Sequence, residues 1–269
     1  MITIAMDSVD LEQIEASGQC FRWQRLSDAR YAIPLHGTVF TVRQLARDAV
    51  EVDGDWPEER LAATMRAYFD ADFDYSALAQ AVDPADAYLC AALSYGRGLR
   101  ILRQPLWETL VSFIISQNNN IPRIRGIVQR LCGGELAPFP APRAVAAMGE
   151  DRLREIGSGY RAPYLLRAAQ RFDAREEEEM LAMDGAAARE RLMQYAGVGG
   201  KVADCIRLFA LGHRAAFPRD VWVKRILAEH YPQGFALEND PNAGVYQQFM
   251  FAYERATAGE KRRGTQSVG

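Results

Sequence analysis

The chain of 269 residues contains 49% hydrophobic and 25% charged residues and has a net charge of −3, a composition typical of a globular protein in water. No apolar run approaches the ~18 residues that a membrane-spanning helix needs, and the start, Met1–Asp7, lacks the basic segment of a signal peptide. The four cysteines are too widely separated for a zinc or iron–sulfur site (Cys20, Cys90, Cys132 and Cys205). We therefore expect a cytoplasmic protein with reduced thiols, no membrane segment and no metal site.

The charges are unevenly distributed along the chain. The net negative charge argues mildly against a nucleic-acid ligand, because DNA-binding domains are usually basic. Residues 97–130, however, contain six arginines and a single acidic residue, Glu108. This segment is compatible with a small DNA-contacting surface and, almost equally, with an arginine-rich face in contact with water.

The first 55 residues have the pattern of short strands separated by turn-forming residues. After Pro57 the apolar spacing changes to that of amphipathic helices. The predicted strands span 1–6, 18–25, 29–36 and 39–43, and the predicted helices span 58–69, 75–82, 85–95, 105–116, 121–132, 141–148, 150–156, 160–172, 177–181, 184–195, 200–211, 220–230 and 241–257. This order predicts an α+β fold with an antiparallel β domain and its following helices (1–84), a large all-α body (85–257) and a disordered tail (258–269).

A glycine-rich turn, Gly197-Val-Gly199-Gly, leads into a predicted helix whose first turn contains Lys201. Backbone N–H groups at such a helix start bind phosphate, and a lysine there neutralises the phosphate or acts as a nucleophile. Asp220 follows nineteen residues later, at the start of the next amphipathic helix. A Walker A loop is excluded because Val202 follows the lysine, and a Rossmann turn is excluded because a helix precedes the glycines. An ordinary tight turn with a solvated lysine is the alternative.

Two further segments carry side chains suited to DNA. Three consecutive asparagines, including Asn118, interrupt the helical pattern just before Arg123; such amides hydrogen-bond to bases or fill a vacated base stack. Tyr160 and Arg161 follow a Gly-Ser-Gly hinge at a helix start, a combination that wedges into DNA. A plain loop and an ordinary helix start are the alternatives.

Two more segments combine aromatic side chains with a glycine or an amide. Gly18 lies in Ser17–Trp23, an aromatic stretch predicted as a strand, where a bulged strand start is the alternative. Gln247 and Phe251 are four residues apart and therefore share one face of the predicted last helix. An amide beside an aromatic ring can clamp a base, although core packing is the more frequent explanation of such a pair.

Taken together, and in their order along the chain, these five segments resemble those of the helix-hairpin-helix DNA glycosylases, and within them the bacterial type of 8-oxoguanine DNA glycosylase. The resemblance extends from about Leu11 to about Arg255. Its most specific motifs are Ser-Gly-Gln-Cys-Phe-Arg-Trp, Asn-Asn-Asn-Ile-Pro-Arg-Ile, Gly-Tyr-Arg-Ala, and Gly-Val-Gly-Gly-Lys-Val-Ala-Asp-Cys with its downstream Pro-Arg-Asp. The resemblance implies a small antiparallel sheet followed by a helix-hairpin-helix glycosylase body.

The resemblance also implies a bifunctional enzyme that removes a base and then cleaves the abasic site by β-elimination. Lys201 matches the lysine that attacks the sugar and forms a Schiff base, and Asp220 matches the aspartate that assists this attack. Trp222 and Lys224 depart from the His and Trp of eukaryotic members, which puts the phosphate contacts there in doubt. No cofactor is implied, although a structural cation bound by hairpin carbonyls around 195–200 stays open.

The remaining matches concern DNA. Gly18 matches the glycine whose carbonyl reads the lesion, Cys205 and Phe251 match the residues that sandwich the flipped base, and Gln247 matches the amide at its Watson–Crick edge. The implied partner is double-stranded DNA with 8-oxoguanine opposite cytosine, bound by a monomer. The residues matched to the opposite base, the gap and the DNA backbone are Asn118, Arg123, Tyr160, Arg161, Gly197 and Gly199.

Two other interpretations remain. A glycosylase of this fold for another lesion is weakened because no cysteine follows Cys205, whereas adenine and thymine-glycol members often carry a C-terminal iron–sulfur site. Members that act on alkylated bases lack the lysine that is present here as Lys201. A non-catalytic helix-hairpin-helix DNA-binding protein needs neither Lys201 nor Asp220, so their joint presence argues against it.

Overall fold

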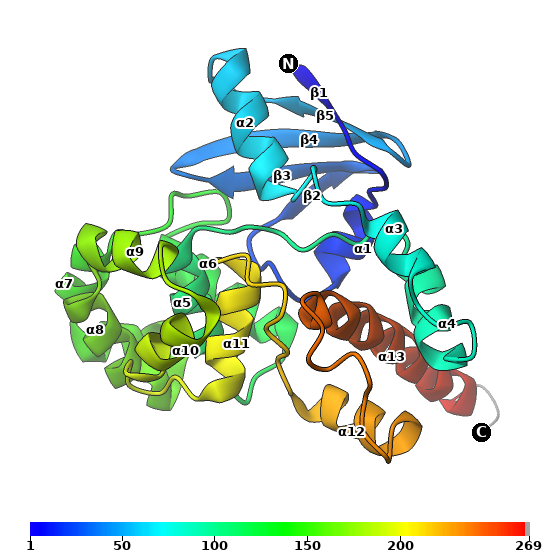
Figure 1. The fold of residues 1–269 in the computed structure, drawn as a ribbon. Coiled ribbons are helices and arrows are strands. Elements are labelled where there is room, and N and C mark those ends of the chain that lie inside the picture. Colours follow the sequence, from blue (N-terminus) through cyan, green and yellow to red (C-terminus); the bar gives the residue numbers. More distant parts are fainter. Residues whose placement is uncertain (267–269) are drawn as a thin grey trace.

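The computed structural model describes the backbone of residues 1–266 and the side chains of residues 1–258. One antiparallel sheet with the strand order β1-β5-β4-β3-β2 lies against a helical body, and helix α2 crosses one face of this sheet (Figure 1). The predicted α+β class is therefore confirmed. The strands are β1 (Ile2–Ala5), β2 (Gln24–Ser27), β3 (Arg30–Leu35), β4 (Thr38–Ala46) and β5 (Ala49–Asp53).

The N-terminal unit differs from the predicted pattern in two places. Strand β5 was not predicted, although Val50 and Val52 alternate with more polar residues and are fully buried. The predicted strand 18–25 is wrong over most of its length, since only β2 from Gln24 onward is extended. A short helix that was not predicted, α1 (Leu11–Ala16), precedes it, and Asp10 caps this helix by accepting from the backbone N of Gln13.

The helical body follows the predicted order closely. The predicted break between 148 and 150 is a kink at Gly149 inside α7, where φ is 72°. After α7 the chain forms a π-helical turn (Arg154–Ser158) and a 3-10 turn (Gly159–Arg161). The helices are α2 (Glu58–Tyr68), α3 (Tyr75–Gln80), α4 (Ala87–Tyr95), α5 (Leu106–Ser116), α6 (Ile121–Cys132), α7 (Pro142–Leu153), α8 (Ala162–Arg171), α9 (Ala174–Leu181), α10 (Gly185–Met193), α11 (Gly200–Phe209), α12 (Val221–His230) and α13 (Ala243–Gln266).

Helix α13 returns to the first half of the chain and lies beside α4 (Figure 1). It continues to Gln266, beyond the predicted end at residue 257, so the predicted tail boundary at 258 falls within a helix. The last part of that predicted tail, residues 267–269, lies outside the described residues. Within residues 1–266 no helix has the length and hydropathy needed to cross a bilayer.

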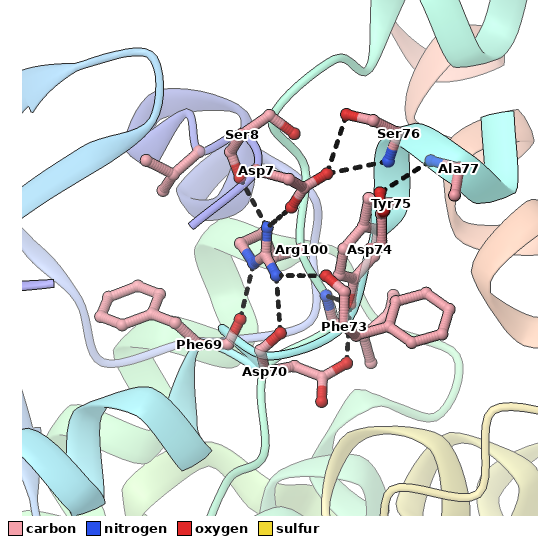
Figure 2. Close-up of polar contacts among 12 residues, drawn as sticks. Asp7, Ser8, Phe69, Asp70, Phe73, Asp74, Tyr75, Ser76, Ala77 and Arg100 are labelled. Carbon is pink, nitrogen blue, oxygen red and sulfur yellow. Dashed lines mark hydrogen bonds and ion pairs between the residues drawn. The ribbon is translucent and has the colours of Figure 1, made fainter. Parts of the chain in front are cut away.

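A fully buried arginine, Arg100, joins the segment after β1 to the segment between α2 and α3. Its guanidinium donates to the carbonyls of Ser8, Phe69, Asp70 and Phe73 and to the Asp7 carboxylate, over 2.6–3.0 Å (Figure 2). These acceptors account for all five N–H groups of an arginine, which removes the large cost of burying an unpaired charge. The Arg100 carbonyl in turn accepts from Gln19 Nε2 at 2.9 Å, so this network reaches the loop that contains Gly18.

Candidate active site

Lys201 lies in the first turn of α11, at the end of the hairpin between α10 and α11. The turn needs glycine at Gly197, where φ is +79° and a Cβ atom would lie 2.4 Å from the Tyr164 ring. Gly199 is the N-cap residue of α11, and the first turn of this helix, whose N–H groups have no partner within the helix, lines the same cavity as Lys201. The Lys201 ammonium lies 5.6 Å from the centroid of the buried Phe113 ring in α5.

Asp220 is the N-cap residue of α12, as predicted. Its carboxylate accepts a hydrogen bond from the backbone N of Val223 at 2.8 Å, which fixes the side chain at the start of the helix. Lys201 and Asp220 line one open cavity of about 640 Å³, together with Gly199 and Asn118. The structure therefore brings together four residues that are distant in the sequence.

Cys205 follows Lys201 by one helical turn and is buried. Burial raises the pKa of its thiol, the neighbouring Lys201 acts to lower it, and Asp220 acts to raise it. These opposing influences place the thiol within electrostatic range of both candidate catalytic groups. A protonated thiol at this position offers an uncharged, polarisable wall to an aromatic ligand.

Gly18 lies in the turn after α1 and faces Phe251 of α13. A Cβ atom on Gly18 would lie 3.6 Å from Phe251 Cε1 and 3.1 Å from Ile121 Cδ1. Its φ of +77° belongs to the left-handed region, which favours glycine. The prediction of a strand at Gly18 is therefore wrong, because Ser17 and Gly18 form a turn. This turn packs between Ile121 of α6 and Phe251 of α13.

The carbonyls around Gly18 are bound by side chains from three other segments. Arg125 donates to the Glu15 carbonyl at 3.1 Å, and Arg255 donates to the Ala16 carbonyl at 3.2 Å. Gln248 donates to the Ser17 carbonyl at 2.9 Å, and Gln104 donates to the Gln19 carbonyl at 2.8 Å. Within the described part of the chain, the Gly18 carbonyl accepts none. The Gly18 carbonyl is therefore an unpaired acceptor between carbonyls that accept side-chain hydrogen bonds.

Gln247 is buried on α13, one turn before Phe251. Its side chain is only 3% exposed, and its Oε1 atom has no hydrogen-bond partner among the described residues. A buried amide oxygen without a partner costs free energy, and a ligand that donates a hydrogen bond would remove that cost. Gln247 and the Gly18 carbonyl thus provide two unpaired acceptors near Phe251.

The asparagine loop and the Tyr160–Arg161 turn contact each other. Asn120 caps α6 by accepting from the backbone N of Arg123 at 3.0 Å, and Asn118 has a positive φ of 46°. Arg161 is 3% exposed, its guanidinium lies 4.4 Å from the Tyr160 ring centroid, and it donates to the carbonyls of residues 117 and 118. Tyr160 is half exposed and Arg123 is exposed, so both side chains face the solvent beside the cavity.

Sequence reasoning missed several residues of this region. Val221 is 82% exposed although it is apolar, and it lines the cavity next to Asp220 with Trp222. Gln248 and Arg255 are seven residues apart and so lie on one face of α13. This spacing can be seen in the sequence, but the sequence does not show which groups the two side chains bind. Among the side chains of residues 1–258, no three His, Cys, Asp or Glu residues cluster as metal ligands. A cation at the 195–200 carbonyls stays a prediction.

Comparison with known proteins gives a consistent assignment. Residues 1–110 match the family model of the 8-oxoguanine DNA glycosylase N-terminal domain, and residues 111–235 match that of the HhH-GPD superfamily of base excision DNA repair proteins. A probable N-glycosylase/DNA lyase of Methanothermobacter thermautotrophicus is 30% identical over 85% of both chains. The Saccharomyces cerevisiae N-glycosylase/DNA lyase is 37% identical over 50% of this chain, which spans 42% of the yeast protein's length.

A solved structure agrees over nearly the whole fold. The Clostridium acetobutylicum 8-oxoguanine glycosylase/lyase, in complex with double-stranded DNA containing cytosine opposite 8-oxoG, superimposes with a TM-score of 0.84. It is 28% identical, and the match covers 96% of this chain and 99% of that one. The two family models divide the chain inside α5, at residues 110 and 111, so the boundary predicted at residue 84 stays a prediction. The chain belongs to the 8-oxoguanine DNA glycosylase/lyase family, within the HhH-GPD superfamily of base excision DNA repair proteins.

Proposed function

We propose that this protein excises 8-oxoguanine from duplex DNA, opposite cytosine, through a Schiff base on Lys201, and then cleaves the abasic site by β-elimination. The observation that carries the proposal is the position of Lys201 and Asp220, which line one cavity at the N-termini of α11 and α12. A target base lies inside the duplex, so it must first be flipped out, at a cost of about a few kcal/mol.

In the proposed reaction, the uncharged Lys201 amine attacks C1′ of the flipped nucleotide. The bond from C1′ to the base breaks, its electron pair leaves with the base, and the base takes up a proton. The sugar ring then opens as the lysine nitrogen forms the Schiff base. Removal of a C2′ proton expels the 3′ phosphate, and water releases the lysine. Asp220, held by its cap hydrogen bond, stabilises the positive charge that develops on the sugar.

Recognition of the lesion rests on its altered imidazole edge. Guanine has an acceptor at N7, and oxidation of the adjacent carbon places a hydrogen there. The unpaired Gly18 carbonyl gains a hydrogen bond from 8-oxoguanine and is repelled by the N7 lone pair of guanine. Cys205 and Phe251 supply the two faces of the base pocket, and the unpaired Gln247 Oε1 supplies an acceptor for the Watson–Crick edge.

The DNA-binding surface in this proposal surrounds the cavity. The glycine turn at Gly197 and Gly199 presents N–H groups to the phosphate backbone. Asn118 fills the gap left by the flipped base, and the exposed Tyr160 ring wedges beside it. Arg123 donates to the orphaned cytosine, and Arg161 joins it by exchanging contacts with backbone carbonyls for contacts with the base. The protein acts in this scheme as a monomer in the cytoplasm, at the nucleoid, without a catalytic cofactor.

Borohydride reduction of the Schiff base tests this function. The chain contains three lysines, Lys201, Lys224 and Lys261, so the adduct site is readily assigned. We expect wild-type protein to be trapped on 8-oxoguanine·cytosine duplex, and Lys201→Gln to lose the adduct while it still binds the duplex. Lys224→Gln, which alters the other lysine of the cavity, should still be trapped. Undiminished trapping of Lys201→Gln would remove this lysine from the mechanism.

A further inference from the structure

The orientation of the Gly18 carbonyl is determined by residues other than Gly18. A glycine at φ +77° has wide conformational freedom, so it does not hold its own peptide in one direction. The carbonyl of Gly18 belongs to a planar peptide between two others. The preceding plane is held by Gln248, which donates to the Ser17 carbonyl at 2.9 Å, and the following one by Gln104, which donates to the Gln19 carbonyl at 2.8 Å.

Arg255 extends this restraint by one residue toward the helix. Its guanidinium donates to the Ala16 carbonyl at 3.2 Å and lies 5.3 Å from the centroid of the Phe251 ring. A Cβ atom on Gly18 would lie 3.5 Å from Arg255 Nη1, so the guanidinium is in contact range of the turn itself. Burial lowers the pKa of Arg255, and Asp220 acts against that shift, which places the arginine within electrostatic range of the catalytic carboxylate.

We propose that Gln248 and Arg255 are positioning residues that hold the Gly18 carbonyl in its reading direction and thereby set the preference for 8-oxoguanine over guanine. Both residues belong to α13, which also carries Phe251, so one helix supplies a wall of the base pocket and the restraint on the reading loop. The proposal rests on the assignment of Gly18 as the lesion reader under the proposed function.

The effect of this restraint is larger for the wrong base than for the right one. A freely turning carbonyl rotates away from the N7 lone pair of guanine, which relieves the repulsion. The same carbonyl rotates back to accept from the N7–H group of 8-oxoguanine, because a hydrogen bond tolerates moderate misalignment. Loss of the restraint is therefore expected to reduce the discrimination between the two bases more than the excision of the lesion.

The test compares four variants with wild type in single-turnover excision of 8-oxoguanine and of guanine, each opposite cytosine, and in cleavage of a preformed abasic site. Gln248→Met and Arg255→Met remove the donors at nearly constant volume, and Arg255→Lys keeps a donor for the Ala16 carbonyl. Arg66→Met is the matched control, because Arg66 of α2 forms an exposed ion pair with Asp72 and contacts none of the described residues of the Gly18 turn.

We expect each methionine variant to lower the 8-oxoguanine-to-guanine rate ratio by about tenfold, which corresponds to about 1.4 kcal/mol. Abasic-site cleavage should fall by a smaller factor, Arg255→Lys should restore most of the ratio, and Arg66→Met should keep it. Wild-type ratios in both methionine variants would overturn the proposal, as would an equal fall in all three rates, which indicates general destabilisation. A wild-type protein without preference for 8-oxoguanine would instead refute the proposed function.

Discussion

Arg161 donates from Nε to the backbone carbonyl of Gln117 at 2.9 Å. This contact joins the 3-10 turn before α8 to the loop between α5 and α6, two segments that meet at the edge of the cavity. Arg161 Nη1 also donates to the Ser158 carbonyl at 3.2 Å. Each of its three nitrogens therefore donates to a backbone carbonyl, whereas Arg123 is exposed to solvent.

The first prediction concerns the base opposite the lesion. An unpaired cytosine presents acceptors at its ring nitrogen and carbonyl, and adenine presents a donor at the corresponding edge. We expect wild-type excision to be fastest opposite cytosine and slowest opposite adenine, because a wrong base costs ~1–3 kcal/mol in a specific interface. Since Arg123 is the exposed arginine of the pair, Arg123→Ala should flatten this preference and retain excision opposite cytosine to within about tenfold. A variant with the full preference would contradict its role.

The second prediction separates the two functions of Asp220. Asn caps helices about as well as Asp, so Asp220→Asn should preserve the bond from Val223 N and change the melting temperature little. Loss of the charge should slow excision, by roughly the 10²–10³ that a lost electrostatic stabiliser costs. Single-turnover rates and thermal melts check this prediction. A large fall in melting temperature with near-normal excision would make Asp220 a structural cap only.

The third prediction concerns Phe251 as a wall of the base pocket. Phe251→Ala should reduce excision of 8-oxoguanine far more than binding to an abasic-site analogue, because the analogue has no base to stack on the ring. Fluorescence anisotropy with both duplexes and excision assays provide the comparison. If both ligands lose the same affinity, Phe251 acts through core packing.

The fourth prediction concerns the Arg100 network and acid stability. Burial acts to raise the pKa of Asp7, but hydrogen bonds from Arg100 and Ser76 outweigh it and hold that pKa below its usual value. A depressed carboxyl pKa stabilises the fold above the unfolded pKa of about 3.9, and this contribution is lost as the pH falls through the folded value. Asp7→Asn should therefore lower the melting temperature at neutral pH, and the difference from wild type should shrink toward about pH 3.

The control for this measurement is Asp28→Asn. Asp28 is fully exposed, and its ion pair with Arg25 is expected to contribute little, so its variant should follow the wild-type curve. A constant difference between wild type and Asp7→Asn across the whole pH range would assign Asp7 a role that does not depend on its charge.

The helical body could be predicted from the sequence because its helices repeat an apolar spacing, and several of them begin at an Asp or Asn cap residue. Asp220 is an example, since both its position before α12 and its capping bond follow from local residues. Two elements, α1 and β5, were not predicted from their local residues. Their identity is set by tertiary packing, as the complete burial of Val50 and Val52 in the sheet shows.

The candidate site also contains residues that local sequence identifies and residues that only tertiary packing identifies. Motif residues such as Lys201 could be predicted from the sequence because the glycine-rich turn before them is distinctive. The partners of the Gly18 turn were not, since Gln248 lies 231 positions from the Ser17 carbonyl that it binds. No local sequence pattern predicts a contact between segments so far apart. Only the folded arrangement of α1, α6 and α13 identifies it.

The return of α13 to the first half of the chain has a consequence for synthesis. A nascent chain that has emerged from the ribosome only as far as α12 already contains Lys201 and Asp220, but it lacks Phe251 and the donors to the Ala16 and Ser17 carbonyls. Under the proposed function, its reading loop keeps the donors Gln104 and Arg125 but lacks those of α13, and its base pocket has one wall missing. If Lys201 and the Gly18 turn act as proposed, the selective site is completed only when α13 docks, after the nucleophile has been synthesised, and we expect an unfinished chain not to distinguish a damaged base from an intact one.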